Sequence, residues 1–305
     1  MTQPPDDFNP MPGKPETLES GLRRILAPNP SPMTYRGTNT YLIGSHGLAV
    51  LDPGPREPAH LDAILAAVEP GQAITHIIVS HAHLDHSPLA SELSECTGAP
   101  VLAYGTAHAG RSKVMEQLAA DGLTGGGEGI DTQFKPDHEV SDGQIIAGDG
   151  WSLEVIHTPG HIGNHIALGW NGSCFTADHV MGWASSLVSP PDGDLTDFMT
   201  SCERLAERSW RVFYPGHGAP VTEPSDRLGW LISHRQGREA SILKALQSGP
   251  ADACDLARQI YTDIPAALLP AAERNVFAHL VDLAGKSLVS PQGKLSSHIR
   301  FVLGV

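Results

Sequence analysis

The strongest constraint on the fold is a histidine-rich segment, HAHLDH at 81–86, that directly follows the apolar run 74–80 (ITHIIVS). A short run rich in β-branched residues predicts a buried strand, so the segment is expected at that strand's carboxyl end. In extended backbone His81 and His83 project to the same side, while the acid and the last histidine can turn toward a second point. Imidazole and carboxylate groups without thiolates favour Zn²⁺ or another borderline divalent ion. The sequence therefore predicts a metal site at a strand end.

Three further segments repeat the pattern of an apolar run, a turn and one candidate ligand. They end at His161 in HTPGH, at Asp178 in FTAD and at His217 in YPGH. A lone His or Asp after a strand is more often a turn or capping residue, so none of the three is decisive by itself. Strand ends are nevertheless where open α/β architectures gather functional groups. We expect the four segments to converge on one site.

The rest of the first 220 residues alternates predicted strands and helices, which indicates an α/β or mixed α+β fold. Strands are expected at 40–44, 47–52, 74–80, 100–103, 144–146, 151–157, 165–168, 173–177 and 211–214, and helices at 59–68, 88–97, 106–120 and 195–207. The Gly-rich stretch 122–129 lacks the Lys-Ser/Thr of a phosphate loop and is predicted to be a surface loop. The Pro-rich, acidic start lacks a secretory pattern, so we expect an ordered or frayed leader on a cytoplasmic protein.

The pattern changes after Gly218. A long helix capped by Ser225 is predicted over 225–247, followed by helices near 251–261 and 270–284 and strand-like pieces at 287–290 and 297–303. Three helices and a hairpin are similar to a small winged-helix-like module. We therefore predict a catalytic domain over 1–222 and a C-terminal domain over 223–305. The second domain is expected to form part of the pocket wall or a homodimer contact.

Charge argues mildly against a general nucleic-acid binder. The formal net charge is −14, yet residues 225–305 carry nine Lys/Arg against seven Asp/Glu, so the acidic excess lies in the preceding segment. An acidic surface repels polyphosphate at long range. The near-neutral C-terminal segment leaves nucleic-acid binding open there. No apolar run approaches the roughly 20 residues of a membrane span, so no membrane contact is expected.

Taken together, HxHxDH, HTPGH, an acid after a strand and PGH resemble the metallo-β-lactamase superfamily over roughly residues 20–220. The resemblance implies an α+β fold: an αββα sandwich with the metals at one edge and a winged-helix-like helical appendage. It also implies a first metal on His81, His83 and His161, a second on Asp85, His86 and His217, and Asp178 bridging both. The family often has Gly where this chain has Ser87 and Ala177, and Thr where it has Ile162, but no ligand is lost.

Closer similarity to the β-lactamase-like protein 2 subgroup appears in RGTNTYLI (36–43), DPGP (52–55), PDGD (191–194) and HRQGRE (234–239). That subgroup carries a C-terminal winged-helix-like domain and includes a single-strand-selective endoribonuclease. The resemblance implies a hydrolase acting on a phosphodiester or ester-type substrate, either a small molecule or single-stranded RNA.

Two other functions share these features. A glyoxalase II-like thioester hydrolase has the same metal motifs, but its basic and tyrosine cluster for glutathione has no match here, although Arg235, Arg238 and Lys244 lie on the next helix. A nucleic-acid-binding or assembly module with a vestigial metal site is the non-enzymatic alternative. Because every ligand position is filled, the enzymatic interpretation is favoured.

The implied chemistry is hydrolysis by a metal-held hydroxide. Two cations roughly 3.5–4 Å apart can activate one water and clamp both the attacked centre and the leaving oxygen. Zn²⁺ is the expected ion, and Mn²⁺ or Fe also suit the ligand set. We assign catalytic roles to Asp178, beneath the hydroxide, and to Asp85, which either orients the water and accepts its proton or acts purely as a ligand.

Several residues beside the ligands have alternative interpretations. His157, His165 and His179 are predicted to make supporting hydrogen bonds or packing contacts rather than to act as catalysts. Asp52 is predicted either to hydrogen-bond the ligand segment or to serve as an ordinary turn residue. The resemblance places 38–40 near the pocket mouth.

Overall fold

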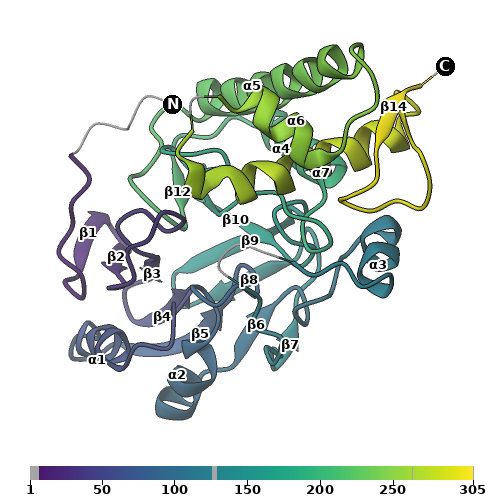
Figure 1. The fold of residues 1–305 in the computed structure, drawn as a ribbon. Helices are drawn as coiled ribbons and strands as arrows, with labels where there is room; N and C mark the ends of the chain where they lie inside the picture. Colours follow the sequence, from purple (N-terminus) through teal and green to yellow (C-terminus); the bar gives the residue numbers. More distant parts are fainter. Residues whose placement is uncertain (1–6, 126–128, 263, 305) are drawn as a thin grey trace.

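Two β-sheets packed face to face form the centre of the molecule (Figure 1). The computed structural model describes residues 7–125, 129–262 and 264–304. The first sheet has seven strands in chain order: β1 (Glu16–Glu19), β2 (Leu22–Leu26), β3 (Asn39–Ile43), β4 (Gly47–Leu51), β5 (Ala73–Ile78), β6 (Val101–Ala103) and β7 (His138–Glu139). Strands β1 to β4 are antiparallel, and β4 to β7 are parallel. The parallel half therefore places the end of β5 at the sheet edge where the histidine-rich segment begins.

The second sheet has five strands in the order β12-β11-β10-β9-β8. They are β8 (Ile145–Gly148), β9 (Trp151–His157), β10 (Ile166–Trp170), β11 (Ser173–Ala177) and β12 (Phe213–Pro215). Strands β8 to β11 are antiparallel, whereas β11 and β12 run parallel. Because β11 and β12 are parallel neighbours, the residues that follow them emerge side by side.

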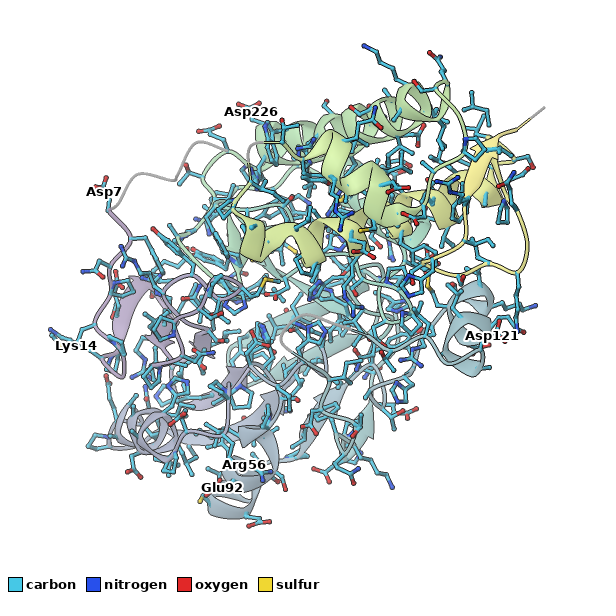
Figure 2. The ribbon with its side chains drawn as sticks, viewed as in Figure 1. Asp7, Lys14, Arg56, Glu92, Asp121 and Asp226 are labelled. Atoms are coloured by element: carbon cyan, nitrogen blue, oxygen red, sulfur yellow. The ribbon has the colours of Figure 1, made fainter. Side chains whose placement is uncertain are left out.

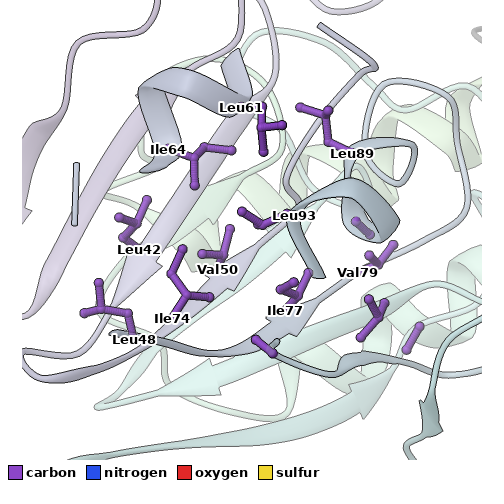
Figure 3. Close-up of a cluster of buried hydrophobic side chains, with 14 of the residues drawn as sticks. Leu42, Leu48, Val50, Leu61, Ile64, Ile74, Ile77, Val79, Leu89 and Leu93 are labelled. Atoms are coloured by element: carbon purple, nitrogen blue, oxygen red, sulfur yellow. The ribbon is translucent and has the colours of Figure 1, made fainter. Parts of the chain in front are cut away.

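Helices cover the outer faces of both sheets. Helices α1 (Pro58–Ala66) and α2 (Leu89–Thr97) cover the first sheet, α4 (Leu195–Ala206) covers the second, and α3 (Lys113–Ala120) lies at one end. Figure 3 shows the first interface, where Leu42, Leu48, Val50, Ile74, Ile77 and Val79 meet Leu61, Ile64, Leu89 and Leu93. A second core, with Tyr41, Phe175 and Trp170, fills the space between the sheets. The predicted αββα sandwich is confirmed.

The C-terminal segment forms helices α5 (Pro224–Leu246), α6 (Ala253–Ile260), η1 (Ala266–Leu268) and α7 (Leu269–Gly285) and the hairpin of β13 (Val289–Pro291) and β14 (Phe301–Leu303). The predicted three helices and terminal hairpin are confirmed. Their own apolar core also includes Met115 and Leu118 of α3. The C-terminal segment is therefore packed against the sandwich. None of the described helices is long and apolar enough to cross a bilayer.

Several predicted boundaries were wrong. The helix predicted at 106–120 begins only at Lys113, because Ser112 caps it by accepting a hydrogen bond from Met115 N. Helix α5 is not capped by Ser225. It starts with Pro224, and the preceding Glu223 makes no side-chain cap. Strands β1, β2 and β7 were not predicted, and the strand predicted at 211–214 begins at Phe213. Residues 126–128 of the predicted Gly-rich loop lie outside the described residues.

Charged side chains lie on the outside of this framework. In Figure 2 the labelled groups, Glu92 on α2 and Asp121 after α3 among them, project away from the sheets. Among the buried exceptions, Asp85 and Asp178 lie beyond the carboxyl ends of strands and are less than 7% exposed. A buried carboxylate is costly without a positive partner. These acids therefore mark the site.

One buried histidine outside that site predicts a pH-dependent stability. The His60 ring is inaccessible to solvent, with Nε2 2.8 Å from Thr40 Oγ1, and burial lowers the pKa of His60 from 6.5 to about 4. The neutral ring is thus favoured by folding, and its contribution is present above pH 6.5 and lost as the pH falls toward 4. We expect the stability advantage of wild type over His60→Asn to shrink by up to about 3 kcal/mol between pH 7.5 and 4.

Urea unfolding of both proteins with chelator present measures this difference. The chelator removes bound metal from both proteins, so metal release adds nothing to either free energy of unfolding. A wild-type advantage that is the same at both pH values would contradict the assignment. Loss of stability by both proteins in parallel is expected from other groups and does not bear on it.

Candidate metal centre

The four predicted segments meet at one edge of the sandwich. His81, His83, Asp85 and His86 follow β5, His161 lies in the loop after β9, Asp178 follows β11 and His217 follows β12. Their ligand atoms form two groups, within each of which all atoms lie within 4.8 Å of one another. We call them the three-histidine group (His81, His83, His161) and the mixed group (Asp85, His86, Asp178, His217). The seven residues that the sequence singled out are therefore brought together.

In the three-histidine group the ring nitrogens converge closely. His83 Nδ1 lies 3.0 Å from His81 Nε2 and 3.0 Å from His161 Nε2. His161 Nδ1 donates to Leu187 O at 2.8 Å, which leaves its Nε2 as a lone pair facing His83. Bonds of about 2.0–2.1 Å to one tetrahedral Zn²⁺ would separate such nitrogens by about 3.3 Å. The spacing fits a shared cation.

In the mixed group two carboxylates face two imidazoles. His217 Nε2 lies 3.1 Å from Asp85 Oδ2 and 3.3 Å from Asp178 Oδ2, and His86 Nε2 lies 3.4 Å from Asp178 Oδ1. Asp178 Oδ2 is also 3.7 Å from His161 Nε2. The Asp178 carboxylate therefore reaches both groups, which is the position that a bridging ligand requires.

The outward-facing ring nitrogens are held by the protein. His217 Nδ1 lies 3.1 Å from Gly37 O, His86 Nδ1 lies 2.9 Å from Asp52 Oδ2, and His81 Nδ1 lies 2.9 Å from Ser80 Oγ. A metal-binding histidine commonly donates its second N–H to such a carbonyl or carboxylate, which fixes the tautomer. When both rings are neutral and Nδ1 donates, the Nε2 lone pairs of His86 and His217 face each other only 3.3 Å apart. Two facing lone pairs call for a cation between them.

The pKa shifts of the ligand residues also indicate that the site lacks positive charge. Burial lowers the pKa of His83 to about 3 and also lowers that of His81 and His161, so these rings are neutral and able to ligate. Burial opposes protonation of His217 as well, but Asp178 and Asp85 raise its pKa to about 10. Burial alone would raise the pKa of both acids, and the facing histidines lower it instead. Among the described ion pairs, neither acid has a Lys or Arg partner.

Asp52 ties the ligand segment to the first sheet. Its Oδ1 accepts from Ser80 N at 2.7 Å, and its Oδ2 accepts from Ser80 Oγ at 2.7 Å and from His86 Nδ1. Of the two roles predicted for Asp52, the structure supports the hydrogen bond to the ligand segment. Asp52 itself adopts a left-handed backbone with φ of 51°. It is a positioning residue for His86.

Replacing Asp52 by Asn is therefore expected to weaken metal binding. The amide can still contact Ser80, but it lacks the charge that orients and strengthens His86 as a ligand. We expect a loss of metal affinity of about 10- to 100-fold, measured by competition with a chromogenic chelator. Asp62→Asn on the exposed side of α1 is the control, and equal affinity of both variants would contradict the role.

The flanking histidines have separate structural partners. His157 stacks on Tyr104 with centroids 3.7 Å apart, and its Nε2 is 2.9 Å from Gly163 O. His179 packs on Phe198 with centroids 4.4 Å apart. His165 lies beside the His81 ring, 5.1 Å between centroids, with Nδ1 2.8 Å from Thr158 Oγ1. The contacts agree with the predicted supporting roles.

Residues 38–40 do not lie at a pocket mouth, contrary to the prediction from resemblance. All three are fully buried. Asn39 Nδ2 donates to Pro215 O and Gly218 O at 3.0 and 2.9 Å, and so anchors the loop that carries His217. The sequence pattern predicted the strand from residue 40 but not this contact, because its partner lies far away along the chain.

Two small residues allow the second sheet to present its ligands. Ala177, where the family often has Gly, has a φ of 40°, in the left-handed region that favours glycine. A Cβ on Gly216 would collide with Asp178 Oδ1 and lie 2.8 Å from His86 Cε1. Gly216 is therefore required by close packing behind two ligands. The PGH motif carries this requirement together with its histidine.

Comparisons with known proteins agree with this geometry. The sequence profile of the Metallo-beta-lactamase superfamily matches residues 33–217, and that of the Beta-lactamase associated winged helix domain matches residues 253–294. The chain is 31% identical over 287 residues to the Beta-lactamase-like protein 2 homolog of Drosophila melanogaster, covering 91% of this chain and 90% of that protein.

Two further similarities bear on fold and chemistry. A Beta-lactamase domain protein from Burkholderia ambifaria superposes with a TM-score of 0.81 at 20% identity, covering 99% of this chain and 97% of the other, which shows a shared fold. The Atrochrysone carboxyl ACP thioesterase of Aspergillus fumigatus is 27% identical over 240 residues, covering 76% of this chain and 67% of that protein.

Proposed function

The chain belongs to the metallo-beta-lactamase superfamily, and from that premise we propose that it hydrolyses a carboxylic ester or thioester at a two-metal site. The observation that carries the proposal is the convergence of five histidines and two aspartates into two adjacent groups of ligand atoms. Phosphodiester hydrolysis, including that of RNA, is the second candidate.

The protein residues would divide the work as follows. The three-histidine group would hold one ion, the other ligands of the mixed group the second, and Asp178 would bind both. Such ions supply a water that ionises near neutral pH and a clamp for the attacked and leaving oxygens. Asp85 Oδ1 is buried and has no hydrogen-bond partner among the described residues. That oxygen is suited to orient the attacking water and accept its proton.

Two observations favour an ester or thioester over a polyphosphate. The chain is similar to a protein named as an ACP thioesterase, and the acidic excess of residues 1–224 disfavours an extended anion there. The match to the winged helix domain over residues 253–294 is the observation that favours RNA. Binding of single-stranded RNA that weakens steeply with salt would support the second candidate, and its absence would remove it.

The proposed function is tested in two steps. Metal analysis of purified protein is expected to give two divalent ions per chain. Assays with Zn²⁺-, Mn²⁺- and Fe-loaded protein then compare matched thioester, carboxylic ester, phosphodiester and lactam substrates. Hydrolysis of thioester or ester that disappears on chelation supports the proposal, whereas turnover confined to phosphodiesters would refute it in favour of the second candidate.

A further inference from the structure

A second feature of the molecule is a cavity between the sandwich and the C-terminal helices. It has a volume of about 390 Å³, within the range of about 300–1,000 Å³ common for small-molecule sites. Its walls come from 32–35, from 181–187, and from the C-terminal segment between α5 and α7. The C-terminal segment therefore forms one wall of this cavity.

The cavity lining is mainly apolar. The apolar side chains that the argument uses are Met33, Met181, Leu187, Ile264, Leu268 and Ala271. These residues come from three separate parts of the chain. These apolar walls favour contact with a hydrocarbon group, because binding such a group removes apolar surface from water.

Polar side chains also line the cavity, and Trp183 Nε1 and His234 Nδ1 are buried there without a hydrogen-bond partner among the described residues. Arg235 is buried and donates to Ser186 O and, at 3.1 Å, to Asn275 Oδ1, so it braces two walls. The Arg238 guanidinium lies over the Tyr261 ring, 4.2 Å from its centroid. Neither arginine forms an ion pair with a described carboxylate. The lining thus offers an apolar interior with cationic groups and no opposing acid.

One wall of the cavity is shared with the metal centre. Leu187 lines the cavity, and its carbonyl oxygen accepts the Nδ1–H of His161 at 2.8 Å. The adjacent Ser186 hydroxyl donates to the backbone carbonyl of Asp178. The segment 186–187 therefore contacts the ligands on one side and the C-terminal helices on the other. The cavity and the metal centre are therefore neighbours that share this segment.

We propose that this cavity binds the apolar acyl group of the ester or thioester that the metal centre hydrolyses. The inference rests on the proposed function and narrows it to substrates with a medium-length hydrocarbon acyl group. Each methylene moved from water into such a cavity contributes about fourfold in binding. The acyl group is thereby selected by length, because an acetyl group fills little of the cavity and a long chain exceeds it.

The first test is an acyl-length series. Hydrolysis of N-acetylcysteamine thioesters from acetyl to dodecanoyl is measured with metal-loaded protein. We expect kcat/KM to rise about threefold to fourfold per methylene, reach a maximum in mid-series and then level or fall. Hydrolysis with no dependence on length would overturn the cavity assignment and leave the proposed function standing.

The second test fills the cavity. Ala271→Trp places an indole in the lining, and Ala240→Trp on the exposed face of α5 is the matched control. The octanoyl-to-acetyl ratio of kcat/KM is expected to fall at least 30-fold in the first variant and to stay at the wild-type value in the second. Leu268→Ala enlarges the cavity and is expected to shift the preferred chain length upward, which a folding defect would not do.

A binding readout separates the two proposals. Octanoate binding to metal-loaded protein is measured by calorimetry, without turnover. Binding by wild type and by the control variant, but at least 10-fold weaker in Ala271→Trp, supports the cavity even if no thioester is hydrolysed, in which case the proposed function fails alone. Equal octanoate binding by all three proteins, or none by wild type, would overturn the cavity assignment.

Discussion

Replacing Asp178 by alanine is expected to lower kcat/KM by at least about 10³-fold and bound metal from two ions to one or fewer per chain. The reason is its position. Its Oδ1 lies 3.4 Å from His86 Nε2 of the mixed group, and its Oδ2 lies 3.7 Å from His161 Nε2 of the three-histidine group. No other described carboxylate spans both groups in this way. Removing it deletes a ligand from each group and the charge that both share.

The measurement combines metal analysis with steady-state kinetics on the preferred substrate. Asp149→Ala, at an exposed turn 70% accessible, is the control and is expected to retain two ions and full activity. Two bound ions with unchanged kcat/KM in the Asp178 variant would refute the bridging assignment. Two ions with greatly reduced turnover would instead show that Asp178 acts in catalysis without being needed for metal retention.

Replacing Gly216 by alanine is expected to cost about 100-fold in kcat/KM, although a single methyl group is added. The new Cβ would overlap Asp178 Oδ1 and approach His86 Cε1 to 2.8 Å. The backbone cannot retreat easily, because Gly216 N donates to Ala177 O and Gly216 O accepts from Asn39 N. Displacing ligands by a fraction of an ångström to 1 Å is enough for an effect of this size.

The matched control is Gly229→Ala in α5, where a Cβ meets nothing within 4 Å. There alanine is expected to stabilise the helix by about 0.5–1 kcal/mol and leave activity unchanged. Thermal unfolding and metal titration of both variants separate steric displacement of ligands from general instability. A Gly216 variant with wild-type metal affinity and turnover would contradict the close-packing argument.

The metal centre was predictable because its signals are local. The histidine-rich segment compresses four ligands into six residues, and His161, Asp178 and His217 each follow an apolar run that ends at a turn. Strand ends of neighbouring strands meet in space, so convergence followed from the strand predictions. That these seven residues bind metal stays a prediction, as does the domain boundary at 222/223.

Other parts could not be predicted because their pattern is ambiguous. Strand β2 has adjacent arginines, and Arg24 is buried with Glu16 of β1 2.5 Å away, a pairing that the sequence does not reveal. Asn39 begins β3 and anchors the loop that carries His217, a contact across 176 residues of sequence that the strand pattern does not reveal. The cavity was missed because Met33, Leu187 and Leu268 are indistinguishable in sequence from ordinary core residues.

The ligands are drawn from both sheets: one segment follows β5 of the first, and three follow β9, β11 and β12 of the second. With metal ions bound, the centre would link the two sheets at the edge where the ligands lie. A free-ion concentration of a thousand times the dissociation constant raises the free energy of unfolding by about 4 kcal/mol. The lifetime of the chain against proteolysis should then follow the supply of free metal, so that starvation for the ion removes the protein as well as its activity.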